Sequence, residues 1–292
     1  MLNTELTRSW GLKYPLFQAP MAGVAGGEMA AAVTRAGAFG MIGVFPAATP
    51  EWVATETAKA RAAGPYGVGL MGWALAGRPE LVDIVLAEKP AVLAVSFGDP
   101  SPYVEQAHAA GVKIVAQVQD GASAIQAIDG GVDAVIAQGT EAGGHTGHVG
   151  TIPMIQIVLE LAAPKGIPVL AAGGIATGRG IAGALAMGCD GVWIGTPFLA
   201  TEEAMNTEAA RSKVLRAKEN ETVLTSVFDI VQEAKWPRQY PGRALVNDFT
   251  DKWSKREDEL RESLPEAQAE FTAARARDDY TTHYIYAGQS VG

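Results

Sequence analysis

The stretch with the greatest potential for chemistry is 138–148, in which a glutamine, a glutamate and two histidines lie among four glycines. The imidazole of His145 can transfer a proton or bind an anion near neutral pH, and Glu141 adds a carboxylate. The glycines let the backbone take positive φ and approach a ligand closely. An ordinary glycine-rich turn is the alternative interpretation. The density of polar groups within an apolar strand–helix pattern favours a ligand site.

Three further stretches combine glycine with small residues at the end of an apolar run: 18–23, 171–178 and 194–196. In the last two, backbone amides and the start of a helix would face an anion. This is the usual phosphate site of barrels built from alternating strands and helices. The sequence therefore predicts a ligand that carries a phosphate.

The other reactive side chains indicate neither a metal site nor a hydrolase of the Ser/His/Asp type. Four histidines and one cysteine leave no ordinary metal-ligand set. Cys189 precedes an apolar run and is interpreted as a small buried hydrophobe. His108 and His283 are interpreted as structural. His148 is either a support for the site or a solvated residue.

Composition limits the partners and the location of the protein. The chain has 292 residues and a net charge of −9, and this acidic balance disfavours a nucleic-acid partner. No run of about 18 apolar residues is present for a membrane span, and the first residues lack the pattern of a signal peptide. A single cysteine fits a reducing compartment. The expected location is cytoplasmic.

Eight short apolar runs are predicted as strands, with helical stretches between them. The strands are expected at 15–19, 39–44, 67–71, 91–95, 113–117, 134–137, 168–171 and 191–194, and the helices at 27–35, 50–62, 79–87, 102–109, 122–128, 153–163 and 178–187. Nearly continuous hydrophobic runs are typical of parallel strands covered on both faces. The pattern predicts a (β/α)8 TIM barrel, with an open doubly wound sheet as the alternative. Glycine-rich loops after the first, sixth, seventh and eighth strands favour the barrel.

The composition changes after residue 201 and divides the chain into three parts. Residues 1–201 are predicted to form the barrel. Residues 202–283, rich in Glu, Arg, Lys and Ala, are predicted to form a small helical subdomain in which 251–270 is one solvated amphipathic helix. The subdomain is either a packing and oligomerisation element or a substrate lid. The apolar tail 284–292 is expected to return to the barrel.

Five motifs in this order resemble the nitronate monooxygenase family. They are Phe17-Gln-Ala-Pro-Met21, Gln138-Gly-Thr-Glu-Ala-Gly-Gly-His145-Thr-Gly147, Ala172-Gly-Gly174-Ile, Ile194-Gly-Thr196 and Ala287-Gly-Gln-Ser290. The resemblance covers nearly the whole chain. The same motifs are similar to those of flavin-dependent enoyl-acyl-carrier-protein reductases and of NADH:quinone reductases.

The resemblance implies that the barrel binds FMN without a covalent bond and that His145 is the active-site histidine. The implied cofactor-binding residues are Ala19, Pro20, Met21, Gly69, Gln117, Gln138, Gly143, Gly144, Gly147, Ala172, Gly173, Gly174, Gly195, Thr196, Gln289 and Ser290. Many members of the family carry asparagine where this chain has Gly69. The contact that this asparagine makes with the flavin is therefore expected from Ser96, Gln117 or Trp73.

The resemblance also implies a reaction, the oxidation of an alkyl nitronate by O2 to a carbonyl compound and nitrite. His145 would orient the anionic nitronate or accept the α-proton of a neutral nitroalkane. An NAD(P)H-dependent reductase of enoyl thioesters or quinones is the alternative, and a barrel without enzymatic activity is the third hypothesis. The expected partners are small molecules, with neither nucleic acid nor membrane, and a homodimer is the assembly considered.

Overall fold

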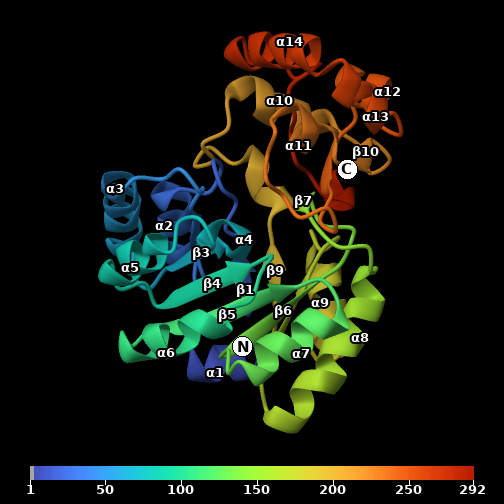
Figure 1. Ribbon diagram of the computed structural model, residues 1–292. Helices are drawn as coiled ribbons and strands as arrows, with labels where there is room; N and C mark the ends of the chain where they lie inside the picture. Colours follow the sequence, from blue (N-terminus) through green and yellow to red (C-terminus); the bar gives the residue numbers. More distant parts are fainter. Residues whose placement is uncertain (1–2) are drawn as a thin grey trace.

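The computed structural model describes residues 3–292 and contains eight parallel strands in one barrel (Figure 1). The strands are β1 (Leu16–Gln18), β2 (Met41–Gly43), β3 (Gly67–Met71), β4 (Val92–Ser96), β5 (Lys113–Val118), β6 (Ala134–Gln138), β8 (Val169–Ala172) and β9 (Gly191–Ile194). Their order around the sheet is β1-β9-β8-β6-β5-β4-β3-β2. A parallel bridge between Phe17 and Phe39 joins the two ends. The predicted TIM barrel is confirmed.

Helices between the strands cover the outside of the barrel. They are α2 (Gly27–Arg35), α3 (Pro50–Arg61), α4 (Gly72–Leu75), α5 (Glu80–Ala87), α6 (Ser101–Ala109), α7 (Gly121–Asp129), α8 (Thr151–Ala162) and α9 (Gly178–Ala186). Local signals set several starts: Thr49 caps α3 with Pro50 after it, and Asp120 forms a capping box with Ser123 on α7. The seven predicted helices are all present, and the short α4 is an addition to them.

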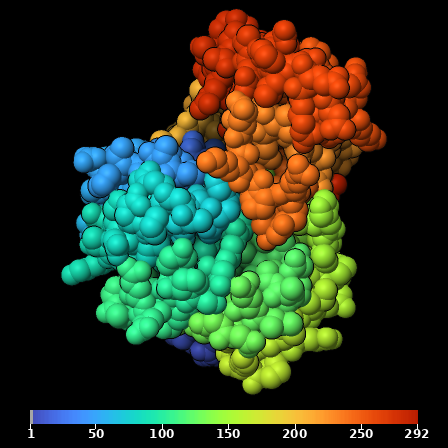
Figure 2. Space-filling view, in the orientation of Figure 1, coloured from blue at the N-terminus to red at the C-terminus, as the bar shows by residue number. Residues whose placement is uncertain are grey.

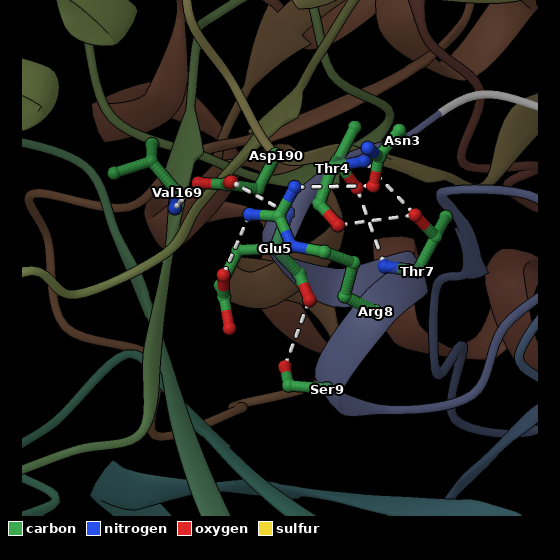
Figure 3. Close-up of polar contacts among 8 residues, drawn as sticks. All are labelled: Asn3, Thr4, Glu5, Thr7, Arg8, Ser9, Val169 and Asp190. Carbon is green, nitrogen blue, oxygen red and sulfur yellow. Dashed lines mark hydrogen bonds and ion pairs between the residues drawn. The ribbon is translucent and has the colours of Figure 1, made fainter.

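Helix α1 (Glu5–Ser9) closes the amino-terminal end of the barrel. Its Leu6 is fully buried in the interior cluster that also contains Phe17 and Trp193. Figure 3 shows how this end is fixed: Asp190 accepts the amide hydrogens of Glu5 at 3.3 Å and Val169 at 3.1 Å. A ligand must therefore enter from the opposite end, where the strands end and where barrels of this type carry their sites.

The carboxyl-terminal part of the chain lies over that opposite end. It contains α10 (Glu208–Arg216), β10 (Thr222–Thr225), α11 (Val227–Val231), β11 (Gly242–Leu245), α12 (Asp248–Trp253), α13 (Glu257–Glu262) and α14 (Leu264–Ala276). In Figure 2 its orange and red atoms stand on the blue and green barrel. The subdomain has its own core, in which Phe228, Phe249 and Phe271 are buried together.

Two expectations for this region are wrong. The subdomain is not wholly helical, because β10 and β11 form an antiparallel pair within it. Residues 251–270 are not one helix but parts of α12, α13 and α14. The first break has a backbone cause, since Lys255 adopts a φ of 67°, which a right-handed helix cannot contain.

A small second sheet joins the subdomain to the barrel. The two-residue strand β7 (Gly144–His145) leaves the loop after β6 and pairs antiparallel with β11, so that His145 lies opposite Gly242. The tail adds an antiparallel bridge between Tyr286 and Ala244. The candidate histidine is thus part of the contact between the barrel and the subdomain.

Candidate active site

His145 is buried and makes a hydrogen bond to a carboxylate across the contact between barrel and subdomain. Its residue exposure is 7%. Its Nε2 lies 2.9 Å from Oδ1 and 3.1 Å from Oδ2 of Asp229, on α11. Asp229 is also shielded, with 12% of its side chain exposed. Because β7 pairs with β11 and α11 lies between β10 and β11 in the chain, the antiparallel sheet brings these two groups together.

Aromatic rings cover the imidazole. The ring of Trp236 is stacked on that of His145, with 3.4 Å between the centroids and 6° between the planes. Trp73, Phe97 and Tyr240 continue this aromatic cover, since Trp73 and Phe97 lie 5.1 Å and 5.0 Å from Trp236. Phe97 adopts a φ of 61°, a strained conformation for a bulky residue, and its ring contacts both Trp236 and Tyr240. The cover excludes water from one face of His145.

Two glutamines hold the loop that carries His145. The side-chain amide of Gln138 donates to the carbonyl oxygen of His145 at 3.1 Å. Its oxygen accepts a hydrogen bond from Gln119 at 2.9 Å. Thr146 donates from its hydroxyl group to the carbonyl of Gly139 at 3.0 Å. These buried bonds fix the backbone on both sides of the imidazole.

Glu141, in the same loop, caps the next helix. Its Oε2 accepts the backbone amide hydrogen of Thr151 at 2.8 Å and the hydroxyl hydrogen at 2.7 Å. Thr151 is the first residue of α8, so the carboxylate lies at the positive end of the helix dipole. The structure therefore gives Glu141 a role in placing the loop.

The tail of the chain lies against the glycine loops that follow β8 and β9. Ser290, in the 3-10 turn η3 (Gln289–Val291), donates to the carbonyl of Gly174 at 2.6 Å. Thr196, in the 3-10 turn η2 (Thr196–Ala200), accepts the amide hydrogen of Gly288 at 2.9 Å. The Gln289 amide donates to the carbonyl of Glu141. Three loops and the tail thus form one continuous structure.

The residues present in these loops fit a phosphate group. No acceptor within residues 3–292 takes the amide hydrogens of Gly174 or Gly195. A Cβ added at Gly178 would meet nothing within 4 Å, and one at Gly195 would meet only Met21 and Ala19 at ordinary distances. The protein itself therefore does not require glycine at either position, whereas the close approach of an anion would. Thr177 caps α9, whose amino terminus faces the same place.

A comparison with known protein families shows to which family this chain belongs. The family model "Nitronate monooxygenase" matches residues 74–290. This chain belongs to the nitronate monooxygenase family. The match includes the His145 loop, both glycine loops and Ser290.

Related proteins and structures of this family agree with that assignment. A probable nitronate monooxygenase of Staphylococcus haemolyticus is 30% identical over 274 residues, 77% of this chain and 76% of the relative. The (3aS,4S,5R,7aS)-5-hydroxy-7a-methyl-1-oxo-octahydro-1H-indene-4-carboxyl-CoA dehydrogenase of Mycobacterium tuberculosis is 34% identical over 229 residues, 78% of this chain but only 64% of the relative. FabK from Thermotoga maritima superposes with a TM-score of 0.85 at 30% identity and covers 100% of this chain and 90% of its own. The first two of these relatives are oxidoreductases by name.

Position 69, where an asparagine was expected from the resemblance, has no room for a side chain in this structure. A Cβ at Gly69 would lie 2.3 Å from Cγ of Pro20, so the proline of the first motif occupies the place of a side chain there. Ser96 and Gln117 are buried neighbours in register on β4 and β5. Trp73 belongs to the aromatic cover instead. Of the three suggested substitutes for asparagine, Ser96 and Gln117 are strand residues within the barrel.

Not every implied cofactor residue has a free surface toward a ligand. A Cβ at Gly147 would lie 2.7 Å from Cβ of Gln119, and one at Gly143 would lie 2.5 Å from the amide nitrogen of Gly288. Both glycines therefore serve close packing within the protein. Gly144 has a φ of 72° with nothing within 4 Å of an added Cβ, so backbone conformation is the reason for glycine there.

The remaining candidate residues take no part in the pair of His145 with Asp229. Cys189 is buried, and burial raises the pKa of its thiol to about 12, which agrees with an inert core residue. His283 packs among aromatic rings of the subdomain core, and His108 pairs with Asp133 on the barrel surface. His148 is exposed.

A Gly-x-Ser-x-Gly pattern does occur once, at 288–292, but it is not a nucleophile elbow. Such an elbow places serine between a strand and a helix. Ser290 lies instead in a 3-10 turn at the end of the chain, and its hydroxyl is bonded to Gly174. This pattern therefore gives no support to a hydrolase of the Ser/His/Asp type.

Two residues of the site, Asp229 and Trp236, were missed by sequence reasoning. Asp229 gave only a weak signal, since it is a single carboxylate inside the otherwise apolar run Val227–Val231. Trp236 lies in a proline-bearing stretch, 235–242, to which no role in the site was assigned. Within residues 3–292, no group of three or more acidic, histidine or cysteine side chains could hold a metal ion.

No helix in the described part of the chain is long and apolar enough to cross a membrane.

Proposed function

We propose that this protein is an FMN-dependent oxidoreductase that oxidises alkyl nitronates with O2 to carbonyl compounds and nitrite. The observation that carries the proposal is the junction of a buried, carboxylate-paired histidine with two glycine loops whose free amides fit a phosphate. The name of the family and that of the probable nitronate monooxygenase of Staphylococcus haemolyticus support the substrate class. The substrates are small molecules.

Different residues of the chain would have different tasks in the proposed site. The loops at Gly173, Gly174, Gly195 and Thr196, with Ser290 beside them, would hold the phosphate of FMN through neutral donors and the α9 dipole. When bound, FMN supplies the electron transfer and the reaction with O2. His145 would hold the anionic nitronate by a hydrogen bond, or take the α-proton from a neutral nitroalkane.

A second function is supported by one of the relatives. The Mycobacterium tuberculosis relative is named as a dehydrogenase of a carboxyl-CoA. That name favours an acyl thioester as the substrate, and an NAD(P)H-dependent reductase of such a thioester is the second candidate. The aromatic cover would suit either substrate, because it offers apolar surface and a hydrogen-bonding histidine.

One pair of assays separates the two functions. Under air, propionate 3-nitronate should cause O2 uptake and nitrite release, while NADH and NADPH should leave anaerobic FMN oxidised for minutes. Rapid bleaching by NAD(P)H without nitronate-dependent O2 uptake would overturn the proposal in favour of the reductase. The variant His145→Asn should lower nitronate turnover on the order of 10²-fold, as expected for a positioned acid–base group. His148→Asn, an exposed histidine on the same loop, is the matched control and should change little.

A further inference from the structure

We propose that Asp229 is a positioning residue that keeps the proton of neutral His145 on Nε2, so that Nδ1 is the nitrogen that exchanges a proton with the substrate. The inference rests on the proposed function for its chemical consequence, but its structural content can be tested without any substrate. It also assigns a role to the subdomain, which supplies the carboxylate.

The contact geometry fixes the tautomer. Nε2 of His145 faces both oxygens of one carboxylate, at 2.9 Å and 3.1 Å. A carboxylate accepts hydrogen bonds and does not donate them, so Nε2 must carry the hydrogen. In a neutral imidazole the other nitrogen then has the lone pair. Asp229 therefore determines which nitrogen is basic.

The second nitrogen is open. Nδ1 of His145 makes no hydrogen bond within residues 3–292, and it is not one of the buried polar atoms closed off without a partner. It therefore retains accessible surface even though the whole residue is only 7% exposed. A basic nitrogen with its opposite side anchored to a carboxylate is the arrangement that general-base histidines use.

The packing of the subdomain fixes the position of Asp229 as well as that of His145. Asp229 lies between buried Phe228 and partly buried Ile230 on α11, in the core of the subdomain. The titratable groups that face the pair are Tyr284 and Tyr286, and each has its pKa raised by burial first and by the nearby negative charge of Asp229 as well. Both tyrosines are therefore neutral near pH 7 and add no charge to the pair.

The proposed proton step is balanced. With a neutral nitroalkane, the α-carbon–hydrogen bond breaks, the proton forms a bond to Nδ1, and the electron pair moves into the nitro group to give the nitronate. The imidazole becomes an imidazolium whose positive charge lies beside the Asp229 carboxylate and under the Trp236 ring. Both neighbours stabilise that charge.

The direct experiment is nitrogen-15 NMR of the histidine side chains in the intact protein, with His145→Asn identifying the signal of His145. At a pH where the imidazole is neutral, we expect hydrogen on Nε2 and a lone pair on Nδ1. In Asp229→Asn, the side-chain oxygen should accept the hydroxyl hydrogen of Tyr286, which turns the amide nitrogen toward Nε2 of His145. Because that nitrogen is a donor, Nε2 must accept, and the proton of the imidazole should move to Nδ1. Hydrogen on Nδ1 in the unmodified protein would overturn the inference, whether or not any variant folds.

Kinetics give a second readout that loss of packing would not produce. Asp229→Asn should lower kcat/KM for a nitroalkane on the order of 10²-fold. It should also move the acid limb of the pH–rate profile to lower pH, because the imidazolium loses its counter-charge. Asp229→Glu should restore part of both. An unchanged profile with lowered activity would reduce Asp229 to a packing residue.

The chain offers a matched control. Asp133, which precedes β6, lies 2.9 Å from Nε2 of His108 in a pair of the same type. His108 lies near the end of α6, away from the barrel mouth, and 45% of its side chain is exposed. Asp133→Asn should leave the pH–rate profile and the His145 signal unchanged. If no nitronate or nitroalkane is turned over, the proposed function fails, while the NMR result still decides the tautomer.

Discussion

Two histidines of this chain show how the surroundings of a residue decide its chemistry. His145 has a carboxylate on one nitrogen and accessible surface at the other, so it can hold and release a proton. His283 has aromatic rings around it, and its Nδ1 is buried without a partner. Burial lowers the pKa of His283 to about 4, with the charge of Arg275 as a second cause. Only the first is suited to catalysis.

This lowered pKa predicts how stability depends on pH. Between pH 6.5 and about 4 the unfolded chain binds a proton at His283 and the folded chain does not, so stability should fall as pH falls through this range. The contribution is about 3 kcal/mol at most. Urea unfolding at pH 7 and pH 5 should show the loss, and His283→Phe should reduce it. The exposed His148→Phe should leave it intact; equal pH dependence in all three proteins would contradict the assignment.

At the scale of elements, the loop after β6 is defined by what it contacts at both ends. Glu141 fixes one end to α8, and β7 fixes the other to β11. Between them, the carbonyl of Glu141 accepts the amide of Gln289 from the tail. The glycines permit this path, but side-chain hydrogen bonds and strand pairing select it.

The cap on α8 predicts a measurable loss. Glu141→Ala removes the acceptor of the Thr151 amide and one of the two acceptors near its hydroxyl, and should lower stability by about 1–2 kcal/mol, the usual cost of a lost cap. Thermal unfolding followed by circular dichroism measures this. Glu160→Ala, an exposed glutamate near the other end of α8, should have little effect. Equal losses for both variants would show that Glu141 contributes charge rather than a cap.

At the scale of the whole molecule, the barrel supplies the glycine loops and His145, and the subdomain supplies the carboxylate and the aromatic cover. The buried Arg243 of β11 reinforces their contact by donating from Nε to the carbonyl of Thr140 at 2.9 Å. A ligand bound at the glycine loops would also contact the tail. Such a ligand should therefore stabilise the complete fold.

FMN binding is predicted to raise the midpoint of thermal unfolding. A ligand that binds only the folded state at 100 times its Kd adds about 2.7 kcal/mol. Riboflavin, which lacks the phosphate, should give a clearly smaller shift and weaker quenching of its fluorescence. Equal shifts for the two flavins would contradict a phosphate site at Gly173, Gly174, Gly195 and Thr196. No shift with either would contradict the cofactor proposal itself.

Much of the fold could be predicted because its signals are local. Continuous apolar runs such as Gly67–Met71 and Gly191–Ile194 are buried on both faces as parallel strands, and the residues that cap or start the helices lie next to them in sequence. The order of strands along the chain then allowed the glycine loops and His145 to be placed at one end of a barrel, because parallel strands end on the same side.

The sequence by itself determined the barrel, the placement of His145 at its mouth and the glycine loops. Only the tertiary structure decided what controls that histidine. Asp229 is 84 residues away, in an apolar helix, and reaches His145 because a two-residue strand pairs with β11. Trp236 is brought over the imidazole by the same subdomain. Antiparallel pairing across such a separation depends on the packing of whole elements, and neither periodicity nor spacing in the sequence records it.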